Sequence, residues 1–281
     1  MEILDGKALS KQIKEQIKND IQREFLAKNK KPPFLACIIV GDNPASKMYV
    51  ASKQKACEYV GIKSCVINLP QNTSQKEVVK EIEKLNKNKD VSAILLQLPL
   101  PDGLNTREII SHISPDKDVD ALCDINLGKL FAKTNTIAPC TATGIVELIK
   151  HYGIKIKGKK VVVVGRSLLV GKSVATLFEE NDGTVTLCHS KTKDLKSITL
   201  EADIIVVAVG KANLIKENMV KEGAVVVDVG INRLNGKIVG DVDFEKVAPK
   251  CSYISPVPGG VGPMTIAELL SNTLTLHKNL H

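Results

Sequence analysis

The sequence predicts an α/β protein with two α/β domains, the second of which is a Rossmann-like, doubly wound parallel sheet. Short apolar, β-branched runs alternate with amphipathic helical stretches along the 281 residues, and continuous apolar strands indicate parallel sheets that are covered on both faces. Residues 159–181 read as a strand of four valines, a glycine turn and a helix. A hydrophobic content of 43% at this length is sufficient for two cores.

The charge of the chain favours anionic ligands, and its composition argues against a nucleic-acid-binding protein. There are 39 basic and 31 acidic residues, a net charge of +8, and a basic surface attracts anions, so a nucleic-acid-binding module stays an alternative. Aromatic residues make up only 3% and there is no Trp, which argues against base stacking. We expect no nucleic acid among the partners.

The cysteines and the apolar segments predict a soluble cytoplasmic protein. Seven cysteines occur with no C-x-x-C pair, a pattern typical of reduced thiols, and we infer no metal site. The first residues lack the apolar stretch of a signal peptide, and no run is long enough to span a bilayer. We therefore expect no membrane partner.

The first domain is expected over residues 1–138, completed by a C-terminal helix at 264–281. Apolar residues spaced by four from Leu9 to Phe25 predict a helix over about 5–28. Strands are predicted at 34–40, 63–69 and 91–100, and helices after the turn GDNPAS (41–46) and at 74–85. Ligands of such sheets lie beyond the carboxyl ends of the strands.

The helix after GDNPAS carries a phenol and an amine four residues apart, Tyr49 and Lys53. Residues at this spacing share a helix face, and we expect the face to turn inward together with Ala56, Cys57 and Val60. A lysine at a water-poor pocket can give and take protons. A lysine that snorkels from the edge of a core has the same spacing, so the pair alone leaves both interpretations open.

Two further polar residues follow predicted strands of the first domain. Gln97 ends the run ILLQ, and it is either a ligand-facing group or a capped strand end. The segment 114–126 holds four Asp residues, and among them Asp120 is our candidate for holding a cationic or amidine-like edge through paired hydrogen bonds. The alternative for this segment is a solvated connection.

The second domain is expected over residues 139–263, entered through a connecting helix at 141–153. In the strand–turn–helix unit only Gly165 and Gly171 remain of a dinucleotide fingerprint, so its specificity is low. The next strand, 184–189, ends at Ser190 and Lys191, where an NAD-preferring domain would have an acid. Together with Arg166, these residues suit a 2′-phosphate and predict NADP. Buried strands follow at 203–210 and 224–230.

The segment PVPGGVGPMT (256–265) contains three Pro and three Gly residues, and a rigid loop of this kind lets the main chain approach a flat ring. It is followed by a helical stripe from Ile266 to Leu274, which we expect to be a second connector between the domains, with a cleft between them.

Together these motifs resemble the bifunctional methylenetetrahydrofolate dehydrogenase/methenyltetrahydrofolate cyclohydrolase family. The resemblance covers nearly the whole chain in order, and its motifs are GDNPAS with YVASKQKA, VSAILLQLPLP, PDKDVD, PCTATG, VVVVGRSLLVGKS, CHSKT, VGDVDF and PVPGGVGPMT. It implies oxidation of 5,10-methylenetetrahydrofolate with NADP and hydrolysis of the methenyl product to 10-formyltetrahydrofolate. It also implies a homodimer whose partner molecules are folates, possibly polyglutamylated.

The resemblance implies a role for each candidate residue. Lys53 is the catalytic lysine, with Tyr49 and Gln97 beside it, and the residues that bind folate are Tyr49, Gln97, Asp120, Pro258, Gly259 and Gly260. The residues that bind NADP are Gly165, Arg166, Ser167, Ser190, Lys191 and Ile231.

Three positions depart from the family pattern. Ala142 and Ser173 stand where prolines are usual, and Ala121 stands where a glycine commonly follows D-V-D. A short-chain dehydrogenase/reductase also uses a Tyr and a Lys four residues apart, but there the pair lies downstream of an amino-terminal nucleotide strand. In this chain it lies upstream.

Overall fold

The computed structural model describes residues 1–280, which divide into two compact units. The three-stranded unit comprises residues 12–140 and 269–280, and the six-stranded unit comprises residues 1–11 and 141–268. Helices α1 (Gly6–Glu24) and α10 (Val261–Leu280) each have residues in both units, whereas α6 (Cys140–His151) begins at the boundary. Residues 1–11 therefore group with the second sheet, which differs from the predicted boundary because β1 (Glu2–Ile3) pairs with a strand of that sheet.

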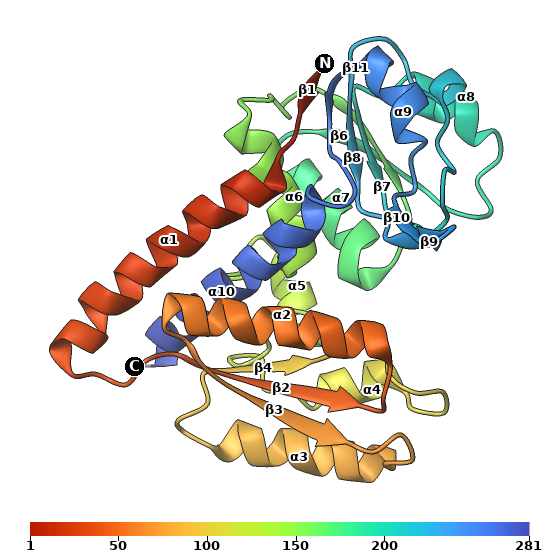
Figure 1. Cartoon of the computed structure of the whole chain (residues 1–281). Coiled ribbons are helices and arrows are strands. Elements are labelled where there is room, and N and C mark those ends of the chain that lie inside the picture. The colour runs from red at the N-terminus through yellow and green to blue at the C-terminus, as the bar shows by residue number, and fades with distance from the viewer. Residues whose placement is uncertain (281) are drawn as a thin grey trace. The chain divides into compact units, whose positions relative to one another are not determined.

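The three-stranded unit contains a parallel sheet in the order β3-β2-β4 (Figure 1). Its strands are β2 (Phe34–Val40), β3 (Lys63–Leu69) and β4 (Ala93–Leu96), and its helices are α2 (Pro44–Val60), α3 (Gln75–Lys87), α4 (Thr106–Ser111) and α5 (Asp124–Phe131). Helices α2 and α3 cover opposite faces of the sheet. The bounds predicted for β2 and β3 are confirmed, but the strand predicted at 91–100 is shorter because the prolines at 99 and 101 have no N–H to donate.

Local sequence explains where the helices of this unit begin and end. Asn43 caps α2 by accepting hydrogen bonds from the main-chain nitrogens of Ala45 and Ser46, and Pro44 occupies the first turn. Gly61 ends the helix in a left-handed conformation. Ser74 forms a capping box with Glu77 at the start of α3. The caps fix where α2 starts relative to the carboxyl end of β2.

The six-stranded unit contains a parallel sheet in the order β1-β11-β8-β7-β5-β6. Its further elements are β5 (Lys160–Val164), α7 (Ser173–Glu180), β6 (Thr184–Cys188), α8 (Leu195–Leu200), β7 (Ile204–Val207), β8 (Ala224–Asp228), the hairpin β9 (Asn232–Leu234) and β10 (Lys237–Val239), α9 (Phe244–Val247) and β11 (Cys251–Ile254). The chain passes from β5 to β6 on one side and then to β7 on the other. The sheet thus has a topological switch point at β5, where ligands of doubly wound folds bind.

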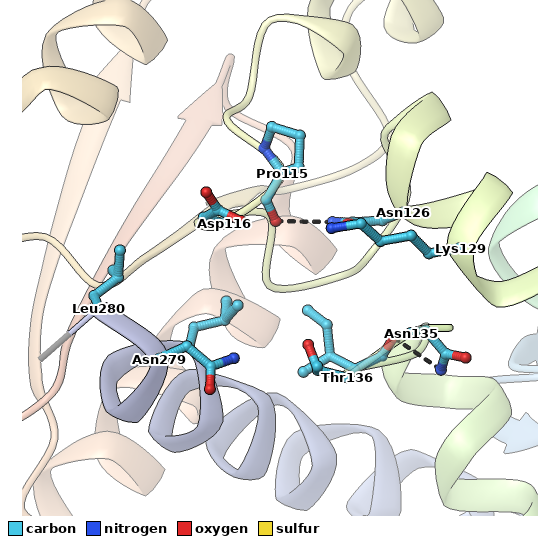
Figure 2. Close-up of a pocket in the computed structure, with 10 residues that line it drawn as sticks. Pro115, Asp116, Asn126, Lys129, Asn135, Thr136, Asn279 and Leu280 are labelled. Atoms are coloured by element: carbon cyan, nitrogen blue, oxygen red, sulfur yellow. Dashed lines mark hydrogen bonds between the residues drawn. The ribbon is translucent and has the colours of Figure 1, made fainter. Parts of the chain in front are cut away.

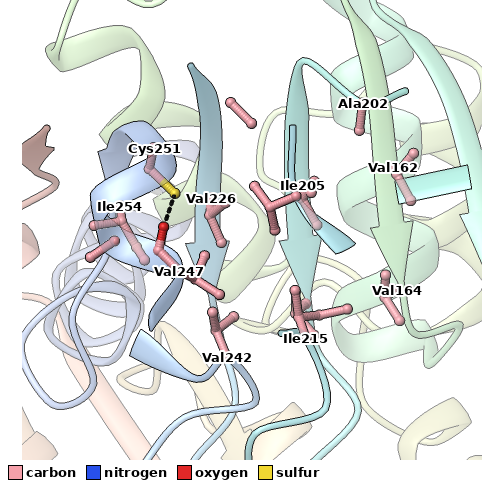
Figure 3. Close-up of a cluster of buried hydrophobic side chains, with 14 of the residues drawn as sticks. Val162, Val164, Ala202, Ile205, Ile215, Val226, Val242, Val247, Cys251 and Ile254 are labelled. Atoms are coloured by element: carbon pink, nitrogen blue, oxygen red, sulfur yellow. Dashed lines mark hydrogen bonds between the residues drawn. The ribbon is translucent and has the colours of Figure 1, made fainter. Parts of the chain in front are cut away.

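Alternate residues of the strands form the core of the six-stranded unit. Val162, Val164, Ile205 and Val226 lie in one buried cluster (Figure 3), which also includes Val247 and packs Leu195 and Ile198 of α8 against the sheet. The intervening valines of β5, β7 and β8 are also buried, so both faces of the sheet are covered, as the continuous apolar runs predicted.

Several elements of the fold lie outside the sequence prediction. They are β1, β11, the β9–β10 hairpin and the short helices α4, α5, α8 and α9. β11 reads CSYI, and its ladder with β8 has a register shift between Cys251 and Tyr253, so neither periodicity nor composition marks it as a strand. Within residues 1–280 no helix has the length and apolar content needed to cross a membrane.

Candidate active site

The Lys53 side chain is held by Gln97, which lies just beyond the carboxyl end of β4. The Lys53 Nζ atom donates a hydrogen bond of 3.0 Å to Gln97 Oε1. Gln97 is itself fixed, because its Nε2 donates to the Leu98 carbonyl at 2.6 Å and its main-chain nitrogen donates to the Ile38 carbonyl at 2.9 Å. Its amide orientation therefore presents the oxygen to the lysine.

The predicted inward position of Tyr49 is wrong. The buried face of α2 consists of Ser46, Val50, Ala56, Cys57 and Val60, which confirms the inward position of the last three residues. Tyr49 is 41% exposed and Lys53 is half-buried, while Lys55 is exposed. The reason is helical phase: Val50 belongs to the buried side of the helix, and its neighbour Tyr49 is turned about 100° around the axis. Tyr49 is therefore an accessible side chain one turn before Lys53.

The charges of Lys53 and Asp120 both act on the thiol of Cys37, a buried residue of β2. Burial raises the pKa of Cys37 to about 12, the Lys53 charge lowers it and the Asp120 charge raises it further. The main chain also places Asp120 near Gln97, because Asp118 forms a bridge with Ile94 of β4 and Gln97 directly follows that strand. Asp120 is half-buried. The structure thus brings Lys53, Gln97 and Asp120 to one region of the three-stranded unit.

The loop that carries Asp120 is anchored by Lys117 and Asp118. Lys117 Nζ donates to three carbonyl oxygens at the end of α3, those of Leu85 (3.2 Å), Asn86 (2.9 Å) and Asn88 (2.7 Å). Burial lowers the pKa of Lys117. Asp118 lies beside β4, where the main chain forms a parallel bridge with Ile94.

The other contacts of this loop come from buried amides. Asp118 Oδ2 accepts from the Cys123 main-chain nitrogen at 2.7 Å and from Asn126 Nδ2 at 3.2 Å, and burial raises the pKa of this carboxyl. Asn272 of α10 donates to the Val119 carbonyl at 3.0 Å. Sequence reasoning missed Lys117, Asp118 and Asn272 as anchors, although the first two belong to the motif PDKDVD.

One departure from the family pattern has a visible conformational consequence. Ala121, directly after Asp120, has a φ of +53° and is fully buried. This left-handed conformation costs an L-residue roughly 1–2 kcal/mol, which explains why glycine suits the position. The chain accepts the alanine within a loop that Lys117, Asp118 and Asn272 hold on both sides.

Gly165 and Gly171 are required by close approach of the main chain in the strand–turn–helix unit. Gly165 follows β5 with a φ of +128°, and a Cβ there would lie 2.3 Å from the Ala208 carbonyl oxygen. A Cβ on Gly171 would lie 2.1 Å from the Gly165 carbonyl oxygen. The turn is therefore compact enough for a pyrophosphate to approach main-chain N–H groups.

Two serines shape the turn that follows. Residues Leu168–Lys172 form one π-helical turn, which Ser167 caps by accepting hydrogen bonds from the nitrogens of Val170 and Gly171. Ser173 Oγ donates to the Leu168 carbonyl at 2.6 Å. The serine that stands in place of the usual proline thus closes the same turn with its hydroxyl group.

Arg166, Ser190 and Lys191 follow two adjacent strands and are all exposed. The ends of β5 and β6 are joined by the hydrogen bond from the Gly165 nitrogen to the Cys188 carbonyl at 2.9 Å. The turn after β6 is fixed by the hydrogen bond from the Lys191 nitrogen to His189 Nδ1 at 3.1 Å. The sequence from His189 to Lys193 contains no acid, so this strand end presents only neutral and basic side chains.

The remaining predicted residues also lie at the carboxyl edge of the six-stranded sheet. Ile231, after β8, is 50% exposed and Val209, after β7, is 39% exposed. Pro258, Gly259 and Gly260 follow β11, where the Gly259 carbonyl accepts from the Lys7 nitrogen at 2.9 Å. The structure therefore places these residues with the cofactor candidates, and it places Tyr49, Lys53, Gln97 and Asp120 in the other unit.

A separate pocket of about 180 Å³ lies in the three-stranded unit (Figure 2). Its wall includes Asp116, Asn126 and Lys129 on one side and Asn279 and Leu280 of α10 on another. None of the residues predicted for the active site lines it. The Asn126 side chain is fixed within this wall, because its Nδ2 donates a hydrogen bond to the Pro115 carbonyl at 2.9 Å.

Comparison with known families shows to which protein family the chain belongs. Residues 4–120 match the catalytic domain of tetrahydrofolate dehydrogenase/cyclohydrolase, and residues 139–281 match the NAD(P)-binding domain of the same enzyme. The chain belongs to this family. It is therefore an oxidoreductase and a hydrolase, and the family, the fold class and the bifunctional activity predicted from the sequence are confirmed.

Relatives of this tetrahydrofolate dehydrogenase/cyclohydrolase are similar over their whole lengths. The bifunctional protein FolD of Aquifex aeolicus is 54% identical over 98% of this chain and 95% of its own, and that of a Sulfurihydrogenibium species is 56% identical over 99% and 98%. The crystal structure of the Campylobacter jejuni bifunctional enzyme FolD is 52% identical and has a TM-score of 0.97 over 99% of both chains.

The enzyme of Trypanosoma brucei, described as complexed with NADP cofactor and inhibitor, is 37% identical, with a TM-score of 0.94 over 98% of this chain and 96% of its own. These comparisons support neither the short-chain dehydrogenase nor the nucleic-acid-binding alternative.

Proposed function

We propose that this enzyme oxidises 5,10-methylenetetrahydrofolate to 5,10-methenyltetrahydrofolate with NADP, and then hydrolyses the product to 10-formyltetrahydrofolate in one-carbon metabolism. The observation that carries the proposal is the pairing of Lys53 with Gln97 at 3.0 Å in a chain that belongs to the dehydrogenase/cyclohydrolase family. The three-stranded unit is the folate domain, and the six-stranded unit is the NADP domain.

Lys53 supplies proton transfer for the hydrolysis. Attack of water on the methenyl carbon requires that the water lose a proton and that a ring nitrogen gain one when the ring opens. An amine held by one hydrogen bond to Gln97 Oε1 keeps its other positions for water and substrate. Gln97 orients the amine, and Tyr49, exposed one turn earlier on α2, lines the folate site.

Asp120 holds the pterin. Its carboxylate can accept two hydrogen bonds from adjacent N–H groups of a heterocycle, and paired bonds of this kind fix both position and orientation. The loop anchors at Lys117 and Asp118 support this role, because they keep the main chain on either side of Asp120 in one place. Pro258, Gly259 and Gly260 provide main chain that can approach a flat ring closely.

The residues at the carboxyl edge of the six-stranded sheet fit NADP. When bound, this cofactor accepts the hydride from the methylene carbon. Gly165 and Ser167 give a compact turn for the pyrophosphate. Arg166, Ser190 and Lys191 attract the 2′-phosphate. No acid that would repel this phosphate occurs from His189 to Lys193. Ile231 offers an exposed apolar contact. Hydride transfer needs this positioning more than it needs an acid or base.

The enzyme further works as a homodimer in the cytoplasm, and its folate substrates include polyglutamylated forms. The family resemblance supports the dimer, and seven cysteines in a sequence without a C-x-x-C pair support a reducing compartment. The net charge of +8 suits substrates that carry several glutamate carboxylates.

One assay tests the function. Purified protein is mixed with methylenetetrahydrofolate and NADP, and NADPH, the methenyl product and the formyl product are followed over time. We expect all three to form. Formation of none of them would overturn the proposal, and NADPH formation without the formyl product would overturn its hydrolytic half.

A further inference from the structure

Asp241, which the mechanism above does not use, is a fully buried carboxylate that binds a stretch of main chain. Its oxygens accept hydrogen bonds from the nitrogens of Val209 (2.7 Å), Gly210 (3.0 Å) and Lys211 (2.8 Å). Asn232 Nδ2 donates to it as well, at 2.9 Å. Its side chain is 0% exposed, so these N–H groups take the place of water around the charge.

A second buried carboxylate, Asp228 at the end of β8, holds Asp241 in turn. It accepts hydrogen bonds from the main-chain nitrogens of Gly230 (3.0 Å), Asp241 (2.9 Å) and Val242 (2.9 Å). The packing leaves no room for a side chain: a Cβ on Gly230 would lie 2.2 Å from Asp241 Oδ1, and one on Gly240 would lie 1.8 Å from Asp228 Oδ2. Asp228 thus binds the main chain of Asp241, and the Asp241 carboxylate in turn binds residues 209–211.

The segments held by this pair border the carboxyl edge of the sheet at the switch point. Val209 to Lys211 continue from Ala208, whose carbonyl oxygen faces the α-carbon of Gly165. Ile231 lies between Gly230, which is bound by Asp228, and Asn232, which is bound by Asp241. Both segments, one after β7 and one after β8, therefore depend on the same two side chains.

A carboxylate is required at these positions because it only accepts hydrogen bonds. An asparagine has the same shape, but its NH₂ group would face main-chain N–H groups that have no other partner, and an unpaired buried donor is costly. The exposed Val209 and Ile231 side chains would then lose their fixed positions.

We infer that Asp241 and Asp228 are positioning residues for the nicotinamide cofactor, because together they fix the main chain of residues 209–211 and 230–232 that walls its site. The inference rests on the proposed function of the six-stranded unit. Both carboxylates are buried and bind main-chain nitrogens, and Lys53 belongs to the other unit. The pair should therefore affect cofactor binding and hydride transfer but leave methenyl hydrolysis intact.

The test compares Asp241→Asn and Asp228→Asn with the wild-type enzyme, and Asp243→Asn serves as the matched control. Asp243 lies two residues from Asp241, and its carboxylate pairs with Lys246 at 3.3 Å. NADP affinity is measured by calorimetry, and both reaction rates are measured on the same preparations. We expect Asp241→Asn to raise the dissociation constant and the KM for NADP by about tenfold or more. Methenyl hydrolysis should stay near the wild-type rate, and Asp243→Asn should change neither.

A milder variant, Asn232→Ala, keeps both carboxylates and removes one donor, so it tests the inference even if the Asp variants do not fold. We expect a smaller rise in the NADP dissociation constant. Wild-type NADP affinity in Asn232→Ala and Asp241→Asn, or an equal loss of both activities in folded Asp241→Asn, would overturn the inference. A wild-type enzyme that binds no NADP would instead overturn the proposed function.

Discussion

The Lys53 Nζ atom and the Gln97 Oε1 atom lie 3.0 Å apart, and Gln97 is fixed at its own amide nitrogen by the Leu98 carbonyl at 2.6 Å. The amine is therefore held from a rigid strand end, while the helix that carries it exposes Tyr49 one turn earlier. This relationship separates the two reactions by their physical needs: the hydrolysis moves protons, and the hydride transfer does not.

Lys53→Met keeps the aliphatic stem and removes the charged nitrogen. We expect methenyl hydrolysis to fall by about 10²–10⁴, the range typical of a general acid or base. The dehydrogenase rate should fall less, because a positioned folate and cofactor can still react. The measurement is the two rates on one preparation.

The matched control is Lys55→Met, a lysine on the exposed side of the same helix. It should change neither rate appreciably. Equal losses of both activities in Lys53→Met would mean that the residue only positions folate, and a Lys55 effect as large as that of Lys53 would exclude a special role for the bond to Gln97.

Asp120→Ala should weaken folate binding and leave NADP binding unchanged. Removal of the carboxylate leaves a buried donor edge of the substrate unpaired, which costs roughly 1–3 kcal/mol of binding free energy. Calorimetric titration with folate and with NADP gives both affinities. The control is Asp116→Ala, an exposed acid in the same loop. Unchanged folate affinity in Asp120→Ala would mean that the loop is only a solvated connection.

Arg166→Ala should weaken NADP binding more than NAD binding. The guanidinium group follows β5 directly and is exposed, so its contribution depends on the 2′-phosphate that only NADP carries. Dissociation constants for both cofactors, measured at two salt concentrations, check the charge dependence. A wild-type preference for NAD, or an equal effect of the substitution on both cofactors, would contradict the assignment of this pocket.

Glu268 of α10 should make the stability of the enzyme depend on pH. Its side chain is 6% exposed, and burial, followed by repulsion from Glu147, raises its pKa from 4.5 to about 7. Because folding raises this pKa, the contribution of Glu268 to stability is full below pH 4.5 and is lost as the pH rises through 7. Above pH 7 the folded enzyme contains a buried charge that costs free energy.

The glutamine in Glu268→Gln cannot ionise. The free energy of unfolding of this variant, relative to that of the wild type, should therefore increase by about 2–3 kcal/mol between pH 5 and pH 9. Chemical unfolding of both proteins at the two pH values measures this difference. Glu147→Gln, which removes only the neighbouring charge, should show a smaller growth. A constant difference between Glu268→Gln and wild type at all pH values would contradict the shift.

Local sequence determined most of the individual elements. The strands Phe34–Val40 and Lys63–Leu69 occur at the predicted bounds, because short runs that contain β-branched residues and are bounded by turn signals are typical of strands. Gly165 and the basic end of β6 were visible for a similar reason: each requirement concerns a few adjacent residues.

Only the tertiary structure decided which residues those elements meet. Tyr49 was predicted to face inward with Lys53, but Val50 occupies the inward position, and a periodicity of 3.6 residues does not say which of two neighbouring stripes packs on the sheet. β11 was missed because its four residues become a strand only when paired with β8 and β1.

The buried polar network is the clearest case of this limit. In the sequence Lys117, Asp118 and Asp241 belong to quoted motifs, but nothing there marks these residues or Asp228 as buried anchors. Their roles come from partners far along the chain, such as the carbonyl of Leu85 for Lys117 and the nitrogen of Val209 for Asp241. Sequence alone fixes which groups can donate or accept hydrogen bonds. Which of them lose water, and must therefore find each other, is decided by the fold.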